Sequence, residues 1–404
     1  MERQKSDLYP KKKESFIQII IGVLFGVLAF FVFLLYSKDI FNIKTLTENI
    51  PLWVKIVIFI VSYISSVALH ELGHFIAFIK NEIKMRALYI MFLLFIKNKG
   101  KWNFKFRFNA VMLTGGIAIP YIPEIKSEEE LKYYQKAFAK SIIAAPIVTI
   151  LIPIVFGLIS FGIISIYPNN TLKGILIFIT TALFIINIFL ALSCLIKNEL
   201  AIGDFPAFKM CKEDKYFMAI MLQQYRTIQG EYESKNSYLN RILNEYIKEE
   251  FKEKSINIFT LGVIDNSLTI SLANKGEALS NIEDYLKYFE ENPYVLLNSK
   301  LTSVRIVLFS VIEYLAIEKG EFDRAKLLYE KVSDKLNKDK KNKIIEYHIK
   351  QCEHLFGIKD NRAFLLDRNN IKVSEEWPIW SIFEEYYEVE DEINEKIFKS
   401  RVVN

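Results

Sequence analysis

Long apolar stretches, nearly free of charge, dominate the first half of the chain. They cover residues 16–36, 52–79, 141–167 and 174–196. About 20 apolar residues are enough for a helix to cross the hydrocarbon core of a bilayer. The pattern therefore predicts a mainly α-helical, polytopic membrane protein with four transmembrane helices. The first stretch exceeds the apolar region of a signal peptide and lacks a small-residue cleavage site, so we interpret it as a membrane helix.

Basic residues orient these four spans. Lys11, Lys12 and Lys13 precede the first apolar stretch, and the polar segment 80–140 is rich in Lys and Arg. Cytoplasmic loops carry an excess of Lys and Arg, so we expect both segments on the cytoplasmic side. Four crossings then return the second half of the chain to the cytoplasm. The expectation is a multi-pass protein of the cell membrane, with a cytoplasmic amino terminus and a cytoplasmic carboxyl-terminal domain.

A different periodicity interrupts the polar segment that follows the second span. Aromatic residues alternate with polar ones at Trp102, Phe104, Phe106 and Phe108. A period of two is typical of a strand with one apolar face. Residues 88–96 can form a second strand, with a turn at 98–101, so we predict a membrane-associated β-hairpin. Residues 127–140 are interpreted as an amphipathic helix on the membrane surface.

Paired glycines, Gly115 and Gly116, begin the next strand-like segment. Glycine in a strand allows close approach of another backbone, which leaves two interpretations open. The segment is either a simple β-bulge or a strand edge that holds an extended substrate by β-augmentation.

The second half of the chain is rich in charge and has helical periodicity. Apolar residues recur every three to four positions in residues 214–229, 238–251, 301–319 and 322–336. Gly320, Ala325 and Tyr329 are placed as in a tetratricopeptide repeat, but a generic helical bundle explains the same pattern. Either fold would offer a surface for a protein partner.

Composition supports a membrane half followed by a soluble half. The chain is 51% apolar and 25% charged, and the two kinds of residue are segregated. We therefore predict three parts: residues 1–51 with the first span, a membrane core at 52–208, and a cytoplasmic helical domain at 209–404. The net charge of +5 comes without a basic stripe, which argues against nucleic acid as a partner. The three cysteines are scattered, so neither a disulfide framework nor a thiolate zinc site is expected.

The strongest chemical signal lies inside the second predicted span, in the sequence His70-Glu71-Leu72-Gly73-His74. Histidines four residues apart on a helix lie on one face, so both imidazoles can reach the same ion. The pattern is typical of two Zn²⁺ ligands and a glutamate that acts as general base. A chance match would require burying Glu71 in lipid without a purpose, and ionisable groups within membrane helices usually mark a function.

Zinc needs at least a third protein ligand. His348 and His354 lie far away in the soluble half, where packing or surface roles are more common for histidine. Glu199 and Asp204 both follow the fourth span. Asp204 stands between Gly203 and Pro206, which break the helix, whereas Glu199 is typical of a solvated helix end.

Residues 52–208 resemble the site-2 protease family of intramembrane zinc metalloproteases. Four features carry the resemblance: the His-Glu-x-x-His motif, the Gly115-Gly116 strand, the sequence Ala144-Ala145-Pro146-Ile147-Val148-Thr149, and Gly203-Asp204. The third feature is similar to the family's Ala-Gly-Pro-x-x-Asn signature, with Ala145 and Thr149 as departures. Phe205 replaces the glycine that usually follows the aspartate, and Asn187 does not match the family's Asn-x-x-Pro spacing.

The resemblance implies a role for each matching residue. His70, His74 and Asp204 would bind zinc, and Glu71 would be the catalytic base. Gly115, Gly116, Thr149 and Asn187 would contact the substrate backbone. The implied function is hydrolysis of peptide bonds in transmembrane segments or hydrophobic peptides. The alternative is a membrane-tethered helical-repeat scaffold whose degenerate protease core only binds peptides.

Overall fold

The computed structural model describes residues 48, 50–98, 100–108, 115–167, 169–197, 202–339, 341–374 and 378–403. This part of the chain is mainly helical and divides into two compact units. One unit contains the described residues up to Tyr121 together with Tyr133–Asp214, and the other contains Ile122–Lys132 together with the described residues from Lys215 onward. The division of the chain at residues 51 and 208 stays a prediction.

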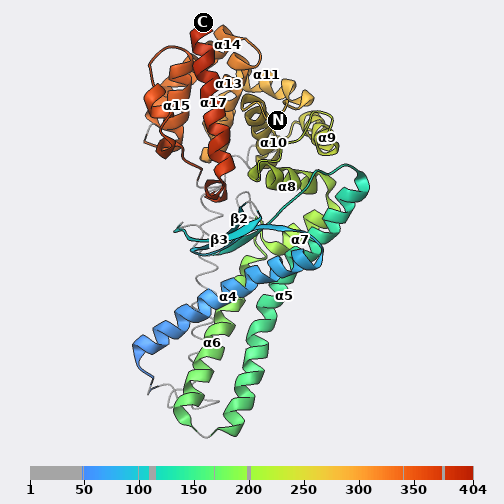
Figure 1. Ribbon diagram of the computed structural model, residues 1–404, viewed down its shortest axis with the longest axis vertical. Coiled ribbons are helices and arrows are strands. Elements are labelled where there is room, and N and C mark those ends of the chain that lie inside the picture. The colour runs from blue at the N-terminus through green and yellow to red at the C-terminus, as the bar shows by residue number, and fades with distance from the viewer. Residues whose placement is uncertain are drawn as a thin grey trace. The chain divides into compact units, whose positions relative to one another are not determined.

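Among the described residues, three helices are long and apolar enough to cross a membrane. They are α4 (Leu52–Lys80), α5 (Glu128–Ile166) and α6 (Asn170–Ser193). Figure 1 shows α4 crossing the hairpin that α5 and α6 form. The predicted first span, residues 16–36, lies outside the described residues, so the prediction of four spans stays a prediction.

Helix α5 differs from the predicted arrangement. The sequence predicts an amphipathic surface helix followed by a separate span, but the structure has one continuous helix of 39 residues. Pro146 and Pro153 lie inside it. Proline is tolerated in membrane helices because neighbouring helices and local adjustments satisfy the freed backbone groups. The two predicted segments are therefore parts of one helix.

The predicted hairpin is part of a larger antiparallel sheet with the strand order β3-β2-β1-β4. The strands are β1 (Met85–Ile90), β2 (Leu93–Asn98), β3 (Lys101–Phe106) and β4 (Gly116–Pro120). The turn before β3 is where the sequence predicts it, but the predicted strand 88–96 is divided between β1 and β2. Met91 makes the division possible by adopting a positive φ of 55°. Strand β4 lies at the sheet edge, beside β1.

The second unit is built from helices, and the four that the sequence predicts are present at nearly the predicted bounds. These are α8 (Lys215–Ile228), α9 (Tyr238–Lys252), α13 (Thr302–Ile317) and α14 (Phe322–Lys338). The remaining α-helices are α10 (Ile258–Leu272), α11 (Glu283–Glu291), α12 (Tyr294–Leu297), α15 (Lys343–Leu355), α16 (Arg362–Leu365) and α17 (Glu384–Val403). Gly320, with a φ of 67°, lies between α13 and α14, but the tetratricopeptide interpretation stays a prediction.

Buried carboxyl groups make the stability of this second unit depend on pH. Glu313 on α13 and Glu390 on α17 are 3% and 6% exposed. Burial raises the pKa of Glu390 to about 7, although a hydrogen bond from Gln351 opposes the shift. Burial also raises the pKa of Glu313, and the charge of Glu390 raises it further. Both groups therefore favour the protonated form in the folded state.

We expect the second unit to lose stability as the pH rises from about 4.5 through 7. The unfolded chain releases the Glu390 proton near its ordinary pKa, whereas the folded chain retains it to about 7. The difference amounts to on the order of 3 kcal/mol at pH 8. Urea unfolding of the full-length chain, followed by hydrogen exchange in α13 and α17, measures it. Glu390→Gln should weaken the pH dependence, whereas Glu388→Gln, on the exposed side of α17, should leave it unchanged.

Candidate metal centre

Two histidines and one carboxylate converge at the centre of the first unit. His70 and His74 lie one turn apart on α4, with ring centroids separated by 5.1 Å. The Nε2 atom of His70 is 3.2 Å from Asp204 Oδ2, and Nε2 of His74 is 3.6 Å from Oδ1. Within the described residues, this is the group of three potential ligands that could hold a metal ion, with donor atoms within 4.8 Å of one another.

A tight turn brings Asp204 to the histidines. Asp204 is the first residue of α7 (Asp204–Glu213), and Gly203 precedes it. A Cβ atom on Gly203 would lie 2.5 Å from the carbonyl oxygen of Cys194, so only glycine fits at this crossing. The Phe205 N–H donates to the same carbonyl at 3.0 Å, and the Cys194 thiol donates to Asp204 Oδ2 at 3.3 Å. The end of α6 and the start of α7 are thereby held together.

The charge state of Asp204 suits a cation. Burial alone would raise the pKa of Asp204, but hydrogen bonds from His70 and His74 outweigh it and lower the pKa below its usual range. The carboxylate is therefore ionised at neutral pH.

Helix α5 orients both imidazole rings. The Nδ1 atom of His74 donates to the backbone carbonyl of Ser141 at 2.9 Å, and Nδ1 of His70 lies 2.8 Å from Thr149 Oγ1. Gly73 permits this approach, since a Cβ atom there would lie 2.9 Å from Ala145 Cα. Histidine ligands in metalloproteins usually bind through one ring nitrogen while the other is held by such a hydrogen bond. Both Nε2 atoms are consequently free to face Asp204.

These distances fit zinc. Ligand nitrogen and oxygen atoms lie about 2.0–2.2 Å from zinc in a tetrahedral site, so two of them are about 3.3 Å apart. Nε2 of His70 is 3.2 Å from one Asp204 oxygen and Nε2 of His74 is 3.6 Å from the other, and one donor atom from each residue lies within 4.8 Å of the other two, so the group could hold one ion. Three protein ligands also leave one position for water or substrate, as catalytic zinc sites require.

Strand β4 lies directly against Glu71, the predicted catalytic base. Glu71 is 5% exposed, and its Oε2 atom has no hydrogen-bond partner among the described residues. A Cβ atom on Gly116 would lie 2.4 Å from the carbonyl oxygen of Tyr89 and 2.6 Å from Glu71 Cγ. Gly116 is therefore required where β4 packs between the neighbouring strand β1 and the side chain of Glu71. At Gly115, by contrast, no atom of the described residues lies within 4 Å of a Cβ position.

The other predicted substrate contacts occupy different places. Thr149 is fully buried at His70, and Asn187 donates to Ser66 Oγ at 2.9 Å, which links α6 to α4. Asn187 Oδ1 has no hydrogen-bond partner in the described part of the chain. Substrate contacts by these two residues stay predictions. Glu199, the alternative third ligand, lies outside the described residues.

The sequence did not indicate the contributions of Ser141 and Cys194. Ser141 acts through its backbone carbonyl, which carries no residue-type signal, and the scattered cysteines argued only against a disulfide framework and a thiolate zinc site. All three cysteines are indeed free and buried.

Comparison with known proteins identifies the family of this chain. A model of Peptidase family M50 matches residues 58–309, which is more than half of the chain and includes the three converging residues and Glu71. Searches among curated proteins and among solved structures gave no match. The chain therefore belongs to Peptidase family M50, the site-2 protease family of membrane metalloproteases.

Proposed function

We propose that this protein is an intramembrane zinc endopeptidase. One observation carries the proposal: His70, His74 and Asp204 converge beside the buried Glu71, on a helix apolar enough to cross a membrane. His70, His74 and Asp204 would hold the metal. Zinc bound there would polarise the scissile carbonyl and acidify water.

Side chains and backbone groups around the metal would transfer protons and orient the ligands. Glu71 would take a proton from the attacking water and later deliver it to the leaving amine nitrogen. Thr149 and the Ser141 carbonyl would keep the two imidazoles in their orientation and tautomer. Because Glu71 is buried beside β4, its carboxylate is shielded from competing contacts with bulk water.

The proposed substrate is a transmembrane segment or a hydrophobic peptide. A helical segment in lipid hydrogen-bonds its own backbone, so it must unwind locally before its peptide bond becomes accessible. Strand β4, at the sheet edge and next to Glu71, could receive the unwound backbone by β-augmentation. Gly116 and Gly115 would then contact the substrate directly.

We also propose that the chain is a multi-pass protein of the cell membrane, with the amino terminus and the helical unit in the cytoplasm. The excess of Lys and Arg before the first apolar stretch and between the second and third supports this orientation. The helical unit would then be accessible to a cytoplasmic protein partner.

The proposal is tested by metal-dependent cleavage of a membrane reporter. The full-length chain is purified in detergent and mixed with a single-span reporter that carries Gly and Pro in its span. We expect cleavage that stops with 1,10-phenanthroline and returns on addition of Zn²⁺ but not of Mg²⁺. A matched reporter with an all-leucine span should be cleaved much more slowly.

The alternative is a scaffold that binds peptides without cleaving them. Zinc-loaded protein that binds the reporter and leaves it intact would favour the scaffold. Cleavage that persists after the metal has been removed would contradict a metalloprotease altogether.

A further inference from the structure

Cys194, at the end of α6, is the residue on which the start of α7 packs. Its carbonyl oxygen accepts the Phe205 N–H at 3.0 Å, and a Cβ atom on Gly203 would lie 2.5 Å from the same oxygen. The Gly203 N–H also donates to the Ile196 carbonyl at 2.7 Å. These backbone contacts fix where Asp204 lies, but they leave its carboxyl group free to rotate.

The Asp204 carboxyl group needs a further contact to stay in one orientation. Rotation about the terminal torsion of an aspartate side chain has no sharp preference of its own. Oδ2 lies 3.2 Å from Nε2 of His70, and Oδ1 lies 3.6 Å from Nε2 of His74. Both nitrogens are proposed zinc ligands, so neither could still donate to Asp204 when zinc is bound. Among the described residues, the Cys194 thiol, 3.3 Å from Oδ2, is then the remaining donor to this carboxylate.

The single thiol proton of Cys194 has two acceptors within reach. The Leu190 carbonyl oxygen lies 3.1 Å from Sγ, slightly nearer than Asp204 Oδ2. That carbonyl already accepts the Cys194 N–H at 3.1 Å and the Ser193 hydroxyl at 2.7 Å. A carbonyl oxygen has two lone pairs, and an ionised acceptor forms the stronger hydrogen bond. The thiol proton is therefore assigned to Asp204.

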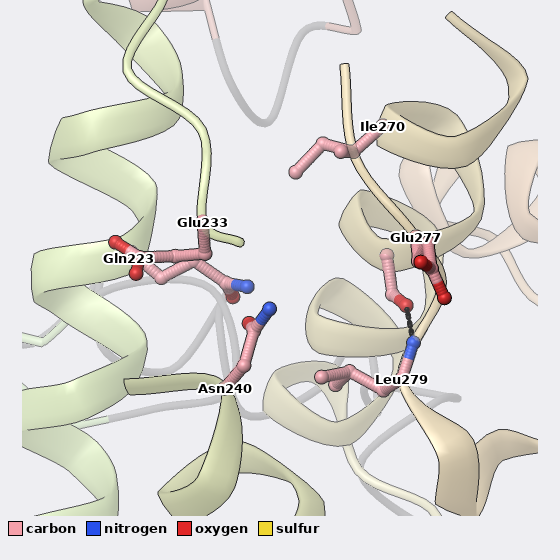
Figure 2. A pocket seen from close by; sticks show the side chains of 7 residues that line it. Gln223, Glu233, Asn240, Ile270, Glu277 and Leu279 are labelled. Carbon is pink, nitrogen blue, oxygen red and sulfur yellow. Dashed lines mark hydrogen bonds between the residues drawn. The ribbon is translucent and has the colours of Figure 1, made fainter. Parts of the chain in front are cut away.

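A neutral donor suits a carboxylate that binds a cation. Glu233, in the helical unit, has the contrasting arrangement, because the Arg226 guanidinium donates to its Oε1 atom. Figure 2 shows Glu233 beside the side chains of Gln223 and Asn240, at a small polar pocket. The positive charge of arginine balances that carboxylate. The Cys194 thiol, by contrast, orients a carboxylate without adding a positive charge, so the negative charge stays available to a metal ion.

We propose that Cys194 is a positioning residue for zinc binding, whose thiol holds the Asp204 carboxylate in the orientation that faces both histidines. Outer hydrogen-bond partners of metal ligands contribute about 10- to 100-fold to metal affinity. A thiol is a weak donor, so we expect an effect at the lower end of that range. The identity of the metal rests on the proposed function, but zinc affinity can be measured without any peptide hydrolysis.

A matched pair of substitutions at Cys194 tests this role. Alanine removes the donor, whereas serine, of nearly the same size as alanine, supplies a hydroxyl donor. We expect the Kd for Zn²⁺ to rise about tenfold in Cys194→Ala and to return most of the way to the wild-type value in Cys194→Ser. Competition with a chromophoric zinc chelator measures both in the full-length, detergent-purified chain. Cys211→Ala is the control, since Cys211 is also buried in this unit, on α7, and should bind zinc like the wild type.

Two further measurements separate an effect on Asp204 from a general structural role. If Cys194 acts through Asp204, its loss has no further effect once that carboxylate is absent. Cys194→Ala combined with Asp204→Ala should therefore bind zinc no more weakly than Asp204→Ala alone. In the Co²⁺-loaded proteins, the visible absorption bands of Cys194→Ala should differ from those of the wild type, and those of Cys194→Ser should not.

Several results would overturn the positioning role. Equal zinc affinity in the wild type and Cys194→Ala would show that the thiol does not orient the ligand. Equal losses in the alanine and serine variants would show that sulfur acts only by its size, and an equal loss in Cys211→Ala would reveal a general loss of stability. Additive losses in the double variant would separate Cys194 from Asp204. A thiolate-to-cobalt charge-transfer band that disappears in Cys194→Ser would make Cys194 a metal ligand itself.

Failure of the positioning role can be distinguished from failure of the proposed function. If the zinc affinities change as expected but even the wild type leaves the reporter intact, the positioning role stands and the protease function fails. If the wild type cleaves the reporter and Cys194→Ala binds zinc equally well, the protease function stands and the positioning role fails. Wild-type protein that binds no Zn²⁺ would overturn both.

Discussion

Replacing Glu71 by Gln is expected to lower the rate of reporter cleavage by about 10²- to 10⁴-fold, the range that general acid–base catalysis contributes. Glutamine keeps the shape of the side chain beside Gly116 but cannot accept the proton of the attacking water. The zinc content should stay at the wild-type level, because Glu71 is not one of the three converging ligands. Initial cleavage rates and metal analysis by inductively coupled plasma mass spectrometry measure the two quantities.

A matched control is available just beyond the end of α4. Glu82→Gln makes the same chemical change in the turn that follows the helix, and it should leave both the rate and the zinc content unchanged. Cleavage by Glu71→Gln at the wild-type rate would assign the base to another residue. Loss of zinc from Glu71→Gln would make Glu71 a metal ligand instead.

Asp204→Ala should weaken zinc binding by more than about 100-fold and abolish cleavage. Loss of an outer hydrogen-bond partner of a metal ligand already costs about 10- to 100-fold in affinity, and loss of a ligand should cost more. The substitution also removes the negative charge that faces both imidazoles. Competition with a chromophoric zinc chelator measures the affinity in detergent.

Asp214→Ala is the control, since it removes a carboxylate from the other end of α7. We expect it to bind zinc and cleave the reporter like the wild type. If Asp204→Ala retained zinc at the wild-type affinity, the third ligand would lie elsewhere, and Glu199 would be tested next.

Local patterns predicted the parts of the site that depend on a single helix. His70, Glu71 and His74 could be recognised because their spacing alone places the two imidazoles on one face of α4. The third ligand depends on a contact between segments. Asp204 reaches the histidines because Gly203 packs on the Cys194 carbonyl, a contact that residue types alone do not specify.

The same distinction explains the roles that the sequence did not reveal. Thr149 meets His70 because Gly73 and Ala145 let α4 and α5 approach closely, so its position depends on helix packing. The strand boundary at Met91 was missed because the positive φ there comes without the glycine or asparagine that usually signals it. Helices of the second unit were predicted well because their amphipathic periodicity is local and uninterrupted.

The third potential metal ligand lies far along the chain from the first two, so the three are synthesised at different times. A ribosome delivers His70 and His74 with α4, but Asp204 follows only after α5 and α6 have been made. Under the proposed function, a nascent chain would carry an incomplete ligand set and could not hydrolyse neighbouring proteins during its insertion. These three residues could bind zinc together only after α6 has been inserted. Zinc would then connect α4 to the start of α7. If the proposed function holds, catalytic competence would follow only after all three helices have been inserted.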